Sequence, residues 1–349
     1  MTFATINPES NFVFTRAEMI KKNTFAIVLT IFSATNLAAQ IKPAPTPVNS
    51  VQVSQSGAAV PLETILIEAA KQSGNYGEAF KNLLATENKV FERYGSGGEV
   101  KEQMNVESLF LVYESPKDKR VSSEVRSVVK VNGNLIPGSE SKSDEFFAEL
   151  KKEKTLESEL KRIQKEGSRY DKTLEISGLT LNKAIILSEN LRSYFDFKLA
   201  GKENYGGNDV YVVGYRQIRK SPFITFNNSS TANPSEPNLD FRLDVPNALK
   251  KNEVFLSGKL WIDAKTFQVR REERHLGLQA ETPIPLIESV FEYQPSDYEI
   301  LVPQRISLTT NEIKKKDGKY IAIKDTRVVF DYSKFKKSNV EVVILDDDK

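Results

Sequence analysis

The sequence predicts a mainly β protein of the α+β class, in which a curved antiparallel sheet forms an incomplete barrel covered by about three helices. Three observations support this fold class. About ten segments alternate between apolar and polar residues with the period of a β-strand. Short turns join these segments, so strands that adjoin in the sequence are expected to pair as an antiparallel meander. Only about three segments have the spacing of an amphipathic helix.

The beginning of the chain has the pattern of an export signal. Residues 21–22 are basic, residues 25–32 form a short apolar run, and the small residues around Ala39 provide a cleavage site. The apolar run is short for a hydrocarbon core of about 30 Å. We therefore predict that residues 1–39 are a signal peptide, with Met19 as an alternative start of translation. The mature protein is then periplasmic or secreted in a bacterium and has no stable transmembrane span, and the alternative is an N-terminal anchor helix.

A stretch rich in Pro, Ser and small residues follows, and its composition at residues 40–60 is typical of a flexible linker. Pro61 then suits the first turn of a helix, and Gly74 suits its exit. One face of this helix is apolar, at Leu62, Ile65, Leu66, Ala69 and Ala70. These residues follow the i, i+3, i+4, i+7, i+8 spacing, so the helix needs a surface to cover.

Two later segments also have helical character. Residues 144–169 carry an apolar stripe among many charges, and Glu157 and Lys161 stand at the stabilising i, i+4 spacing. A charge run of this kind indicates a solvated helix face. A third helix is predicted for Leu181–Arg192, with Thr180 as its N-cap.

Turn residues separate the predicted strands. Asn132-Gly133 and Gly206-Gly207 are typical of tight hairpin turns. The clearest hairpin is residues 258–273, GKLWIDAKTFQVRREE, with its turn at residues 263–266. The folded part, residues 61–345, is predicted to be a single domain.

The hairpin has one apolar and one polar face. Leu260 and Ile262 share one side of its first strand, Phe267 and Val269 alternate with polar residues in the second, and residues 270–274 are charged at every position. An antiparallel sheet with such faces has water on one side and an apolar cover on the other.

About three helices are few for a sheet of this width, so an apolar hollow is expected inside the open barrel. Strand alternation places seven residues on the wall of this ligand cavity: Val212, Leu260, Ile262, Val269, Phe291, Ile321 and Ile323. A single bulge would reverse such an assignment. A Pro- and Asn-rich insertion interrupts the domain at residues 221–252, and an acidic tail follows it at residues 346–349.

Composition excludes several classes of function. The 49 Lys and Arg balance 47 Asp and Glu, so no basic surplus indicates a nucleic-acid partner. The absence of Cys removes disulfides, thiolate metal sites and Cys nucleophiles. The only histidine, His275, is expected on the surface, and Glu272 and Glu273 point to opposite sides of a strand. We therefore predict no catalytic residue, no metal and no cofactor.

Four stretches together resemble the outer-membrane lipoprotein carrier superfamily, the LolA/LolB-like proteins, and within it an uncharacterised secreted bacterial branch. They are LAGKENYGGNDVYVVGY, GKLWIDAKTFQVRREE, VPQRISL and RVVFDYSKF, and the recurring element is G-x-L-W-I-D followed by T-x-x-V. The resemblance covers about residues 78–345 and involves strand and turn signatures rather than reactive residues. It implies a curved, incomplete barrel closed by helices over an apolar cavity that accepts acyl chains. Residues 144–169 and 221–252 have no counterpart in the family pattern.

Two functions remain open from the sequence. The first is a non-enzymatic carrier or chaperone that shelters a lipid acyl chain or a hydrophobic segment. The second is a cell-envelope sensor or interaction scaffold, with an envelope protein as partner and with its cavity filled by its own side chains. A hydrolase has the least support, because the chain has a single His and no Gly-x-Ser-x-Gly elbow.

Overall fold

A computed structural model describes eight stretches of the chain: residues 60–81, 83–114, 122–139, 179–226, 239–241, 245–249, 253–279 and 283–337. The chain divides into two units, Met1–Gly57 and Ala58–Lys349, and every described residue belongs to the second. The predicted signal peptide, nearly all of the linker, the charged helix at residues 144–169 and the acidic tail lie outside the described residues.

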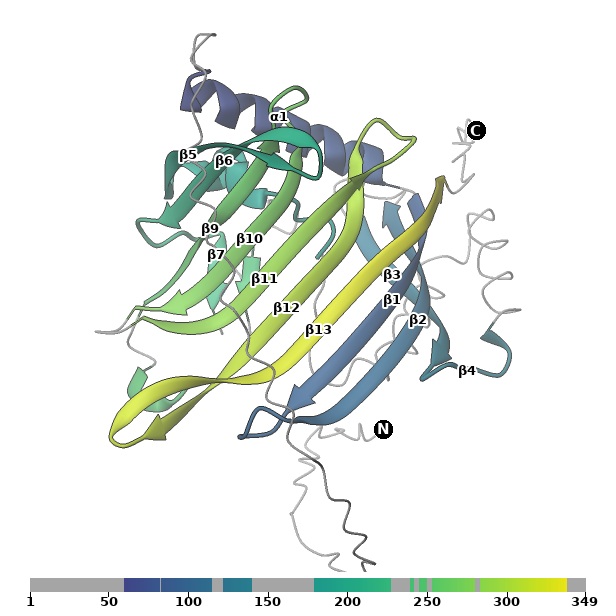
Figure 1. The fold of residues 1–349 in the computed structure, drawn as a ribbon, viewed down its shortest axis with the longest axis vertical. Coiled ribbons are helices and arrows are strands. Elements are labelled where there is room, and N and C mark those ends of the chain that lie inside the picture. The colour runs from purple at the N-terminus through teal and green to yellow at the C-terminus, as the bar shows by residue number, and fades with distance from the viewer. Residues whose placement is uncertain are drawn as a thin grey trace, which may run out of the picture. The chain divides into compact units, whose positions relative to one another are not determined.

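An antiparallel sheet of eleven strands dominates the described part (Figure 1), in the order β4-β3-β2-β1-β13-β12-β11-β10-β9-β6-β5. Its strands are β1 (Leu83–Tyr94), β2 (Val100–Glu114), β3 (Ser122–Val131), β4 (Asn134–Leu135), β5 (Phe195–Tyr205), β6 (Asn208–Gln217), β9 (Val254–Asp263), β10 (Val269–Leu278), β11 (Ile284–Pro295), β12 (Leu301–Lys316) and β13 (Lys319–Lys337). Most neighbours are consecutive in the sequence, and β4 and β5 lie at the two ends. The predicted mainly β fold with an unclosed antiparallel meander is confirmed.

The two predicted tight turns are present. Asn132 and Gly133 connect β3 to β4 with φ values of 50° and 79°, and Gly206 and Gly207 connect β5 to β6 with 58° and 80°. Two successive residues with positive φ match the right-handed twist of the flanking strands, which is why Asn and Gly occupy such positions.

The first helix, α1 (Leu62–Phe80), begins after Pro61 as predicted but continues past Gly74. It buries Ile65, Leu66, Ala69, Tyr76 and Phe80, so the apolar stripe runs along its full length. In Figure 1 the helix lies behind the sheet.

The prediction of one helix over Leu181–Arg192 is wrong. The chain makes turns as far as Ala184, then a 3₁₀ turn, η1 (Ile185–Leu187), and a four-residue helix, α4 (Glu189–Arg192). Ala184 has φ 45° and ψ 36°, a left-handed conformation that a continuous α-helix excludes. The described residues therefore contain one long and one short α-helix, and the expectation of about three covering helices is not met among them.

Directly paired residues on five strands form a row that defines what we call the inner face of the sheet. Leu260 pairs with Glu272, Glu272 with Phe291, Phe291 with Ile306, and Ile306 with Phe330. Cross-strand partners share a face, so α1, which packs against Leu260, covers the inner face. The other side of the sheet is called the charged face below.

The buried apolar residues of the inner face form two clusters. Cluster 1 joins the first half of α1 to β6, β9 and β10, and it includes Leu256, Leu260, Ile262, Leu276 and Leu278. Cluster 2 joins the second half of α1 to β1, β2 and β11–β13.

Part of the predicted insertion covers cluster 1. Strands β7 (Ile224–Phe226) and β8 (Leu239–Phe241) form a separate two-stranded parallel sheet, and a 3₁₀ turn, η2 (Asn247–Leu249), follows. Leu239, Val245 and Leu249 are buried in cluster 1. We call residues 221–226, 239–241 and 245–249 the flap. In Figure 1 its strands lie behind the main sheet.

At the β5 end, the β5–β6 hairpin bends over the charged face. The Tyr205 hydroxyl donates to Glu292 on β11 at 3.1 Å, and Trp261 Nε1 donates to Glu203. A register shift lies between Leu199 and Gly201, and the φ of 145° at Gly201 is a conformation that favours glycine. This bend buries Trp261 together with Val210 and Val212.

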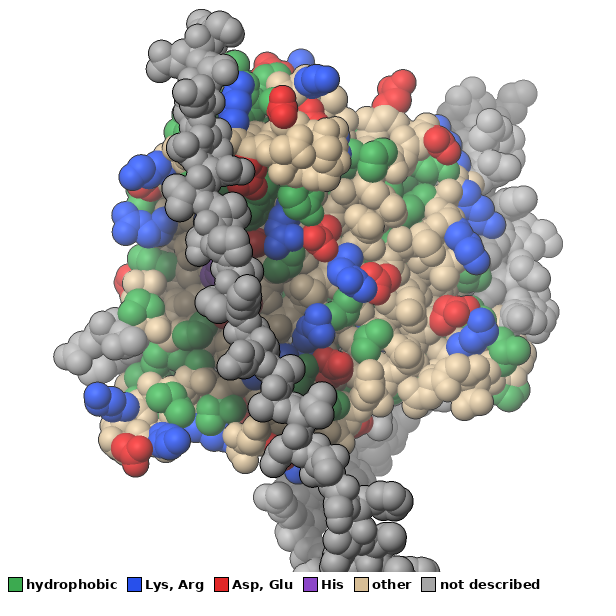
Figure 2. Space-filling view, in the orientation of Figure 1, with side chains coloured by type: hydrophobic (Ala, Val, Ile, Leu, Met, Phe, Trp, Pro, Cys, Tyr) green, Lys and Arg blue, Asp and Glu red, His purple; other side chains and the backbone are tan. Residues whose placement is uncertain are grey.

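Acidic and basic side chains are interspersed over the charged face (Figure 2). Several pair across neighbouring strands, including Arg271 with Glu292 at 2.6 Å and Arg305 with Asp331 at 2.7 Å. This face therefore has the solvated character predicted for the polar side of the sheet.

Candidate functional site

Four of the seven predicted wall residues lie on the inner face. Leu260, Ile262 and Val269 belong to cluster 1, and Phe291 belongs to cluster 2. The region around the first three is almost wholly apolar and is enclosed by α1, residues 184–195 and the flap. It is the described region best suited to contact a hydrophobic ligand.

The other three wall residues lie elsewhere. Val212 contacts Val210 and Trp261 on the charged face, because its cross-strand partner is Trp261 rather than Leu260. Ile321 and Ile323 are half-buried, and it is their neighbours Tyr320 and Ala322 that pack against cluster 1. A register shift between β12 and β13, at Thr310 and Asn311, changes which residues of β13 face cluster 1.

A buried ion pair interrupts the apolar row of the inner face. Glu272 has no exposed surface, and it accepts hydrogen bonds from Arg274 Nε at 3.0 Å and from the Tyr215 hydroxyl at 3.1 Å. Its second oxygen accepts from the backbone N–H of Ala184 at 3.1 Å. The Arg274 guanidinium lies over the Phe291 ring at 4.7 Å. The buried carboxylate therefore has a full set of donors, as such a group requires.

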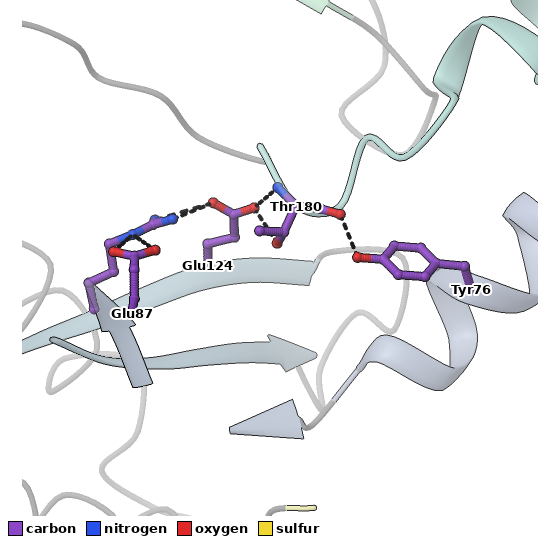
Figure 3. Close-up of polar contacts among 5 residues, drawn as sticks. Tyr76, Glu87, Glu124 and Thr180 are labelled. Atoms are coloured by element: carbon purple, nitrogen blue, oxygen red, sulfur yellow. Dashed lines mark hydrogen bonds and ion pairs between the residues drawn. The ribbon is translucent and has the colours of Figure 1, made fainter. Parts of the chain in front are cut away.

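A second ion pair has the same construction at the other end of the inner face (Figure 3). Glu124 on β3 accepts from Arg126 at 3.2 Å and from both the backbone N–H and the hydroxyl of Thr180, at 2.6 and 2.7 Å. Arg126 also donates to Glu87 at 2.8 Å and lies over the Phe110 ring at 5.1 Å. In each case a Glu and an Arg are two residues apart on one strand, and the Arg covers a Phe of the next strand.

Residues 179–184, which we call the strap, connect these two ion pairs. Besides the bonds to Glu124 and Glu272, the Tyr76 hydroxyl donates to the Thr180 carbonyl at 2.8 Å, and Arg274 donates to the Asn182 carbonyl at 3.2 Å. Side chains of α1, β3 and β10 thus satisfy the main chain of a segment that has no regular structure of its own.

Lys183 in the strap is buried under α1. Its ammonium donates to the Leu301 carbonyl at 2.9 Å and lies over the rings of Tyr76 and Tyr293, at 4.6 and 4.0 Å. Burial lowers the pKa of Lys183 well below its ordinary value, and the nearby Arg270 charge lowers it further. The attraction between the ammonium and the two ring faces offsets only part of the free-energy cost of burying this charge.

Among the described residues, the buried hydroxyl of Tyr293 on the inner face has no hydrogen-bond partner, and the buried hydroxyl of Tyr332 lies beside the Glu87 carboxylate. Burial raises the pKa of both well above the usual value, with Glu272 adding to the effect at Tyr293 and Glu87 at Tyr332. The inner face is therefore not purely apolar, because buried ionised and hydroxyl groups cross its middle. We call these groups the belt; they belong to Glu87, Glu124, Arg126, Lys183, Glu272, Arg274, Tyr293 and Tyr332.

The sequence prediction missed this belt. Residues 270–274 looked like an exposed charged run, but Glu272 and Arg274 are buried while His275 is exposed as expected. The strand alternation did indicate that Glu272 and Arg274 are buried, because both lie on the same side of β10 as the apolar Leu276 and Leu278. The expectation that Glu272 and Glu273 point to opposite sides is confirmed, as Glu273 pairs with Arg271 on the charged face.

Two features are absent from the described residues, a metal-binding cluster and a membrane-spanning helix. The described residues contain no group of three or more His, Asp or Glu side chains that could hold a metal ion. Within the same stretches, no helix is long and apolar enough to cross a membrane.

The sequence matches no known family and no curated protein. Solved structures similar to the chain include a DUF1329 family protein from Desulfovibrio piger, with 11% identity, a TM-score of 0.35, and coverage of 79% of this chain and 93% of that chain. A putative outer membrane lipoprotein-sorting protein domain from Vibrio parahaemolyticus has 12% identity, a TM-score of 0.35, and coverage of 78% and 92%. A LolA superfamily protein from Nitrosomonas europaea has 12% identity, a TM-score of 0.29, and coverage of 80% and 94%.

Proposed function

We propose that this protein is a non-enzymatic binding protein of the bacterial periplasm or exterior that shelters a lipid acyl chain or a hydrophobic segment. The observation that carries the proposal is cluster 1, the apolar half of the inner face. Its cover includes a flap whose two strands are three residues long and form a sheet of their own. Such a short strand pair is marginally stable by itself, so this cover can open more readily than the main sheet.

The ligand belongs at cluster 1 rather than at the belt. Burying apolar surface contributes about 25 cal/mol per Å², so an acyl chain can bind among Leu256, Leu260 and Leu276 without directional contacts. At the belt, an acyl chain would displace the backbone N–H groups of Thr180 and Ala184, from which Glu124 and Glu272 accept hydrogen bonds. A buried carboxylate that loses such a donor costs about 1–3 kcal/mol, even while its Arg partner stays in place.

Protein purified from its host without detergent tests this proposal by native mass spectrometry. We expect a bound lipid, and we expect the delipidated protein to take up a fluorescent fatty acid. Leu239→Ala, which loosens the flap, should speed uptake, whereas Val212→Ala on the charged face should leave it unchanged. Protein that carries no lipid and takes up no probe would contradict the proposal.

The second candidate is an envelope scaffold without a lipid, with an envelope protein as its partner. One observation favours it: the strap and its ion pairs already fill the middle of the inner face with the protein's own groups. A negative result in the lipid experiments, together with capture of a defined envelope protein, would support this candidate.

A further inference from the structure

The inner face recognises the main chain of the strap. Four main-chain groups within five residues are bound by side chains of the body: the N–H and carbonyl of Thr180, the carbonyl of Asn182, and the N–H of Ala184. Main-chain groups are the same in every sequence. A site built from two carboxylate acceptors, a guanidinium and a phenol is therefore suited to a polypeptide segment in general.

The strap also makes side-chain contacts that narrow the choice of segment. Leu179 is buried in cluster 2, and Leu181 packs against the same cluster. The strap makes turns rather than a strand, and it directs both of these leucines to cluster 2. The site therefore accepts an irregular or extended segment with two leucine-like side chains at alternate positions.

The strap fits this site at a cost. Ala184 adopts a left-handed conformation, which is unfavourable for a residue with a Cβ. Lys183 places an ammonium in a buried region, where it donates a hydrogen bond to the Leu301 carbonyl. The hydroxyl of Tyr293, more than nine-tenths buried, has no partner among the described residues while the strap is bound. These features point to a ligand other than the strap, with a polar group that reaches this hydroxyl.

We propose that the strap is an internal occupant of a peptide-binding site, and that an extended segment of another protein takes its place. The partner's backbone N–H groups bind Glu124 and Glu272, its carbonyl groups accept from Tyr76 and Arg274, and two apolar side chains enter cluster 2. This site is separate from the lipid site proposed at cluster 1 and does not depend on it.

A labelled synthetic peptide of residues 179–184, LTLNKA, tests the proposal by fluorescence anisotropy with the full chain. The double variant Leu179→Ala, Thr180→Val removes a buried apolar contact and a hydrogen bond to Glu124, so it weakens the strap and leaves the site itself intact. Apparent affinity rises with the fraction of molecules whose site is free, so we expect this variant to bind the peptide at least about tenfold more tightly than the wild type.

Matched variants on one strand identify the site. In the weakened-strap background, Glu272→Gln should abolish peptide binding, and the adjacent Glu273→Gln, whose side chain lies on the charged face, should retain it. Near-UV circular dichroism confirms that each variant is folded. If folded weakened-strap protein binds the peptide no better than the wild type, or if Glu272→Gln binds as well as Glu273→Gln, the proposal is wrong. Uptake of the fluorescent fatty acid, measured in parallel, reports on the lipid site alone.

Discussion

Glu272 and Glu273 are adjacent in sequence but opposite in environment. Glu272 is fully buried and accepts from Arg274, Tyr215 and Ala184, whereas Glu273 is partly exposed and pairs with Arg271. Removing one partner of a buried pair leaves an uncompensated charge, while a partly exposed pair contributes little. The same chemical change should therefore have unequal effects at the two positions.

We predict that Glu272→Gln lowers the free energy of unfolding by about 3 kcal/mol, because Arg274 then stays buried without a counter-charge. Glu273→Gln should lower it by less than about 1 kcal/mol. Urea unfolding at neutral pH measures both. Equal effects of the two substitutions would show that the Glu272–Arg274 pair is not the stabilising element of this end of the belt.

Lys183 should make stability depend on pH in the alkaline range. Its pKa in the folded protein is lowered by burial, with Arg270 adding to the shift, so the folded state binds fewer protons than the unfolded chain between the two pKa values. Stability is then greatest above the unfolded value of about 10.4 and is lost as pH falls toward the folded value. The groups that face Lys183 are Tyr76, Tyr293 and Arg270.

The variant Lys183→Met should remove this dependence. Between about pH 7 and about pH 9.5, below the titration of the tyrosines, we expect the wild type to gain stability relative to the variant as pH rises. Thermal unfolding of both proteins across this range gives the difference in stability between them. Groups that titrate in both proteins contribute equally and cancel from this difference. A difference that does not change with pH would mean that Lys183 titrates as it does in the unfolded chain.

At the scale of elements, the Asp-led turn of the β9–β10 hairpin is explained by its hydrogen bonds. Asp263 Oδ1 accepts from the backbone N–H groups of Lys265 and Thr266 at 2.9 and 2.8 Å, and Oδ2 accepts from Arg270 at 2.6 Å. Phe267 has φ 57° in the same turn. These bonds hold the pKa of Asp263 below its ordinary value despite partial burial, and they give the Asp at the start of this turn a structural reason.

The glycine that opens this hairpin is required by close packing. A Cβ at Gly258 would lie 1.9 Å from the Glu273 carbonyl oxygen and 2.5 Å from the Tyr215 hydroxyl. At Gly214, on the neighbouring strand β6, the nearest atom would be 3.8 Å away, an ordinary contact distance. The two positions form a matched pair, because both are strand glycines with an extended backbone.

We predict that Gly258→Ala lowers the free energy of unfolding by about 2 kcal/mol or more, since strand β10 and Tyr215 must both move. Gly214→Ala should change it by less than about 1 kcal/mol, in either direction. Thermal denaturation followed by far-UV circular dichroism compares the two. A Gly258→Ala protein as stable as Gly214→Ala would show that β9 and β10 can separate without cost.

Alternation along single strands predicted the face of the sheet correctly for some side chains and incorrectly for others. The reasons differ from strand to strand. It succeeded at Leu260 and Ile262, which lie on the inner face, while Trp261 between them lies on the charged face. On β6 both sides are buried, because the β5–β6 hairpin covers Val212 while Val213 enters cluster 1. No pattern within one strand reveals a hairpin that bends over it. At Ile321 the phase depends on a register shift between β12 and β13, where Asp325 of β13 is an extra residue, and simple alternation along β13 does not reveal it.

At the scale of the whole molecule, the sequence predicted an unclosed antiparallel meander because strand order follows turn chemistry and short connections. It did not predict what lies on the inner face. The strap reaches Glu124 across 56 positions of the chain and Glu272 across 88, so local patterns carry no information about these contacts. Ala184, whose left-handed conformation interrupts the expected helix near its start, likewise donates its N–H to the distant Glu272.

The arrangement of sheet, flap and belt makes a prediction about local stability. The flap consists of two three-residue strands outside the main sheet, and Leu239, Val245 and Leu249 attach it to cluster 1. Strand β12, in contrast, is paired along most of its length on both sides. A segment with few buried contacts opens without global unfolding, whereas a central strand exchanges its amide protons only when the whole domain unfolds.

We therefore expect hydrogen–deuterium exchange at β7 and β8 to be much faster than at β12 under native conditions. Leu239→Ala should accelerate exchange in the flap further and leave β12 unchanged, because the substitution weakens only the attachment of the cover. Val212→Ala is the matched control, since it removes a buried apolar group on the other side of the sheet and should not affect the flap. Equal protection of β8 and β12 would mean that flap and sheet unfold as one cooperative unit, and cluster 1 would then have no separate entrance for a ligand.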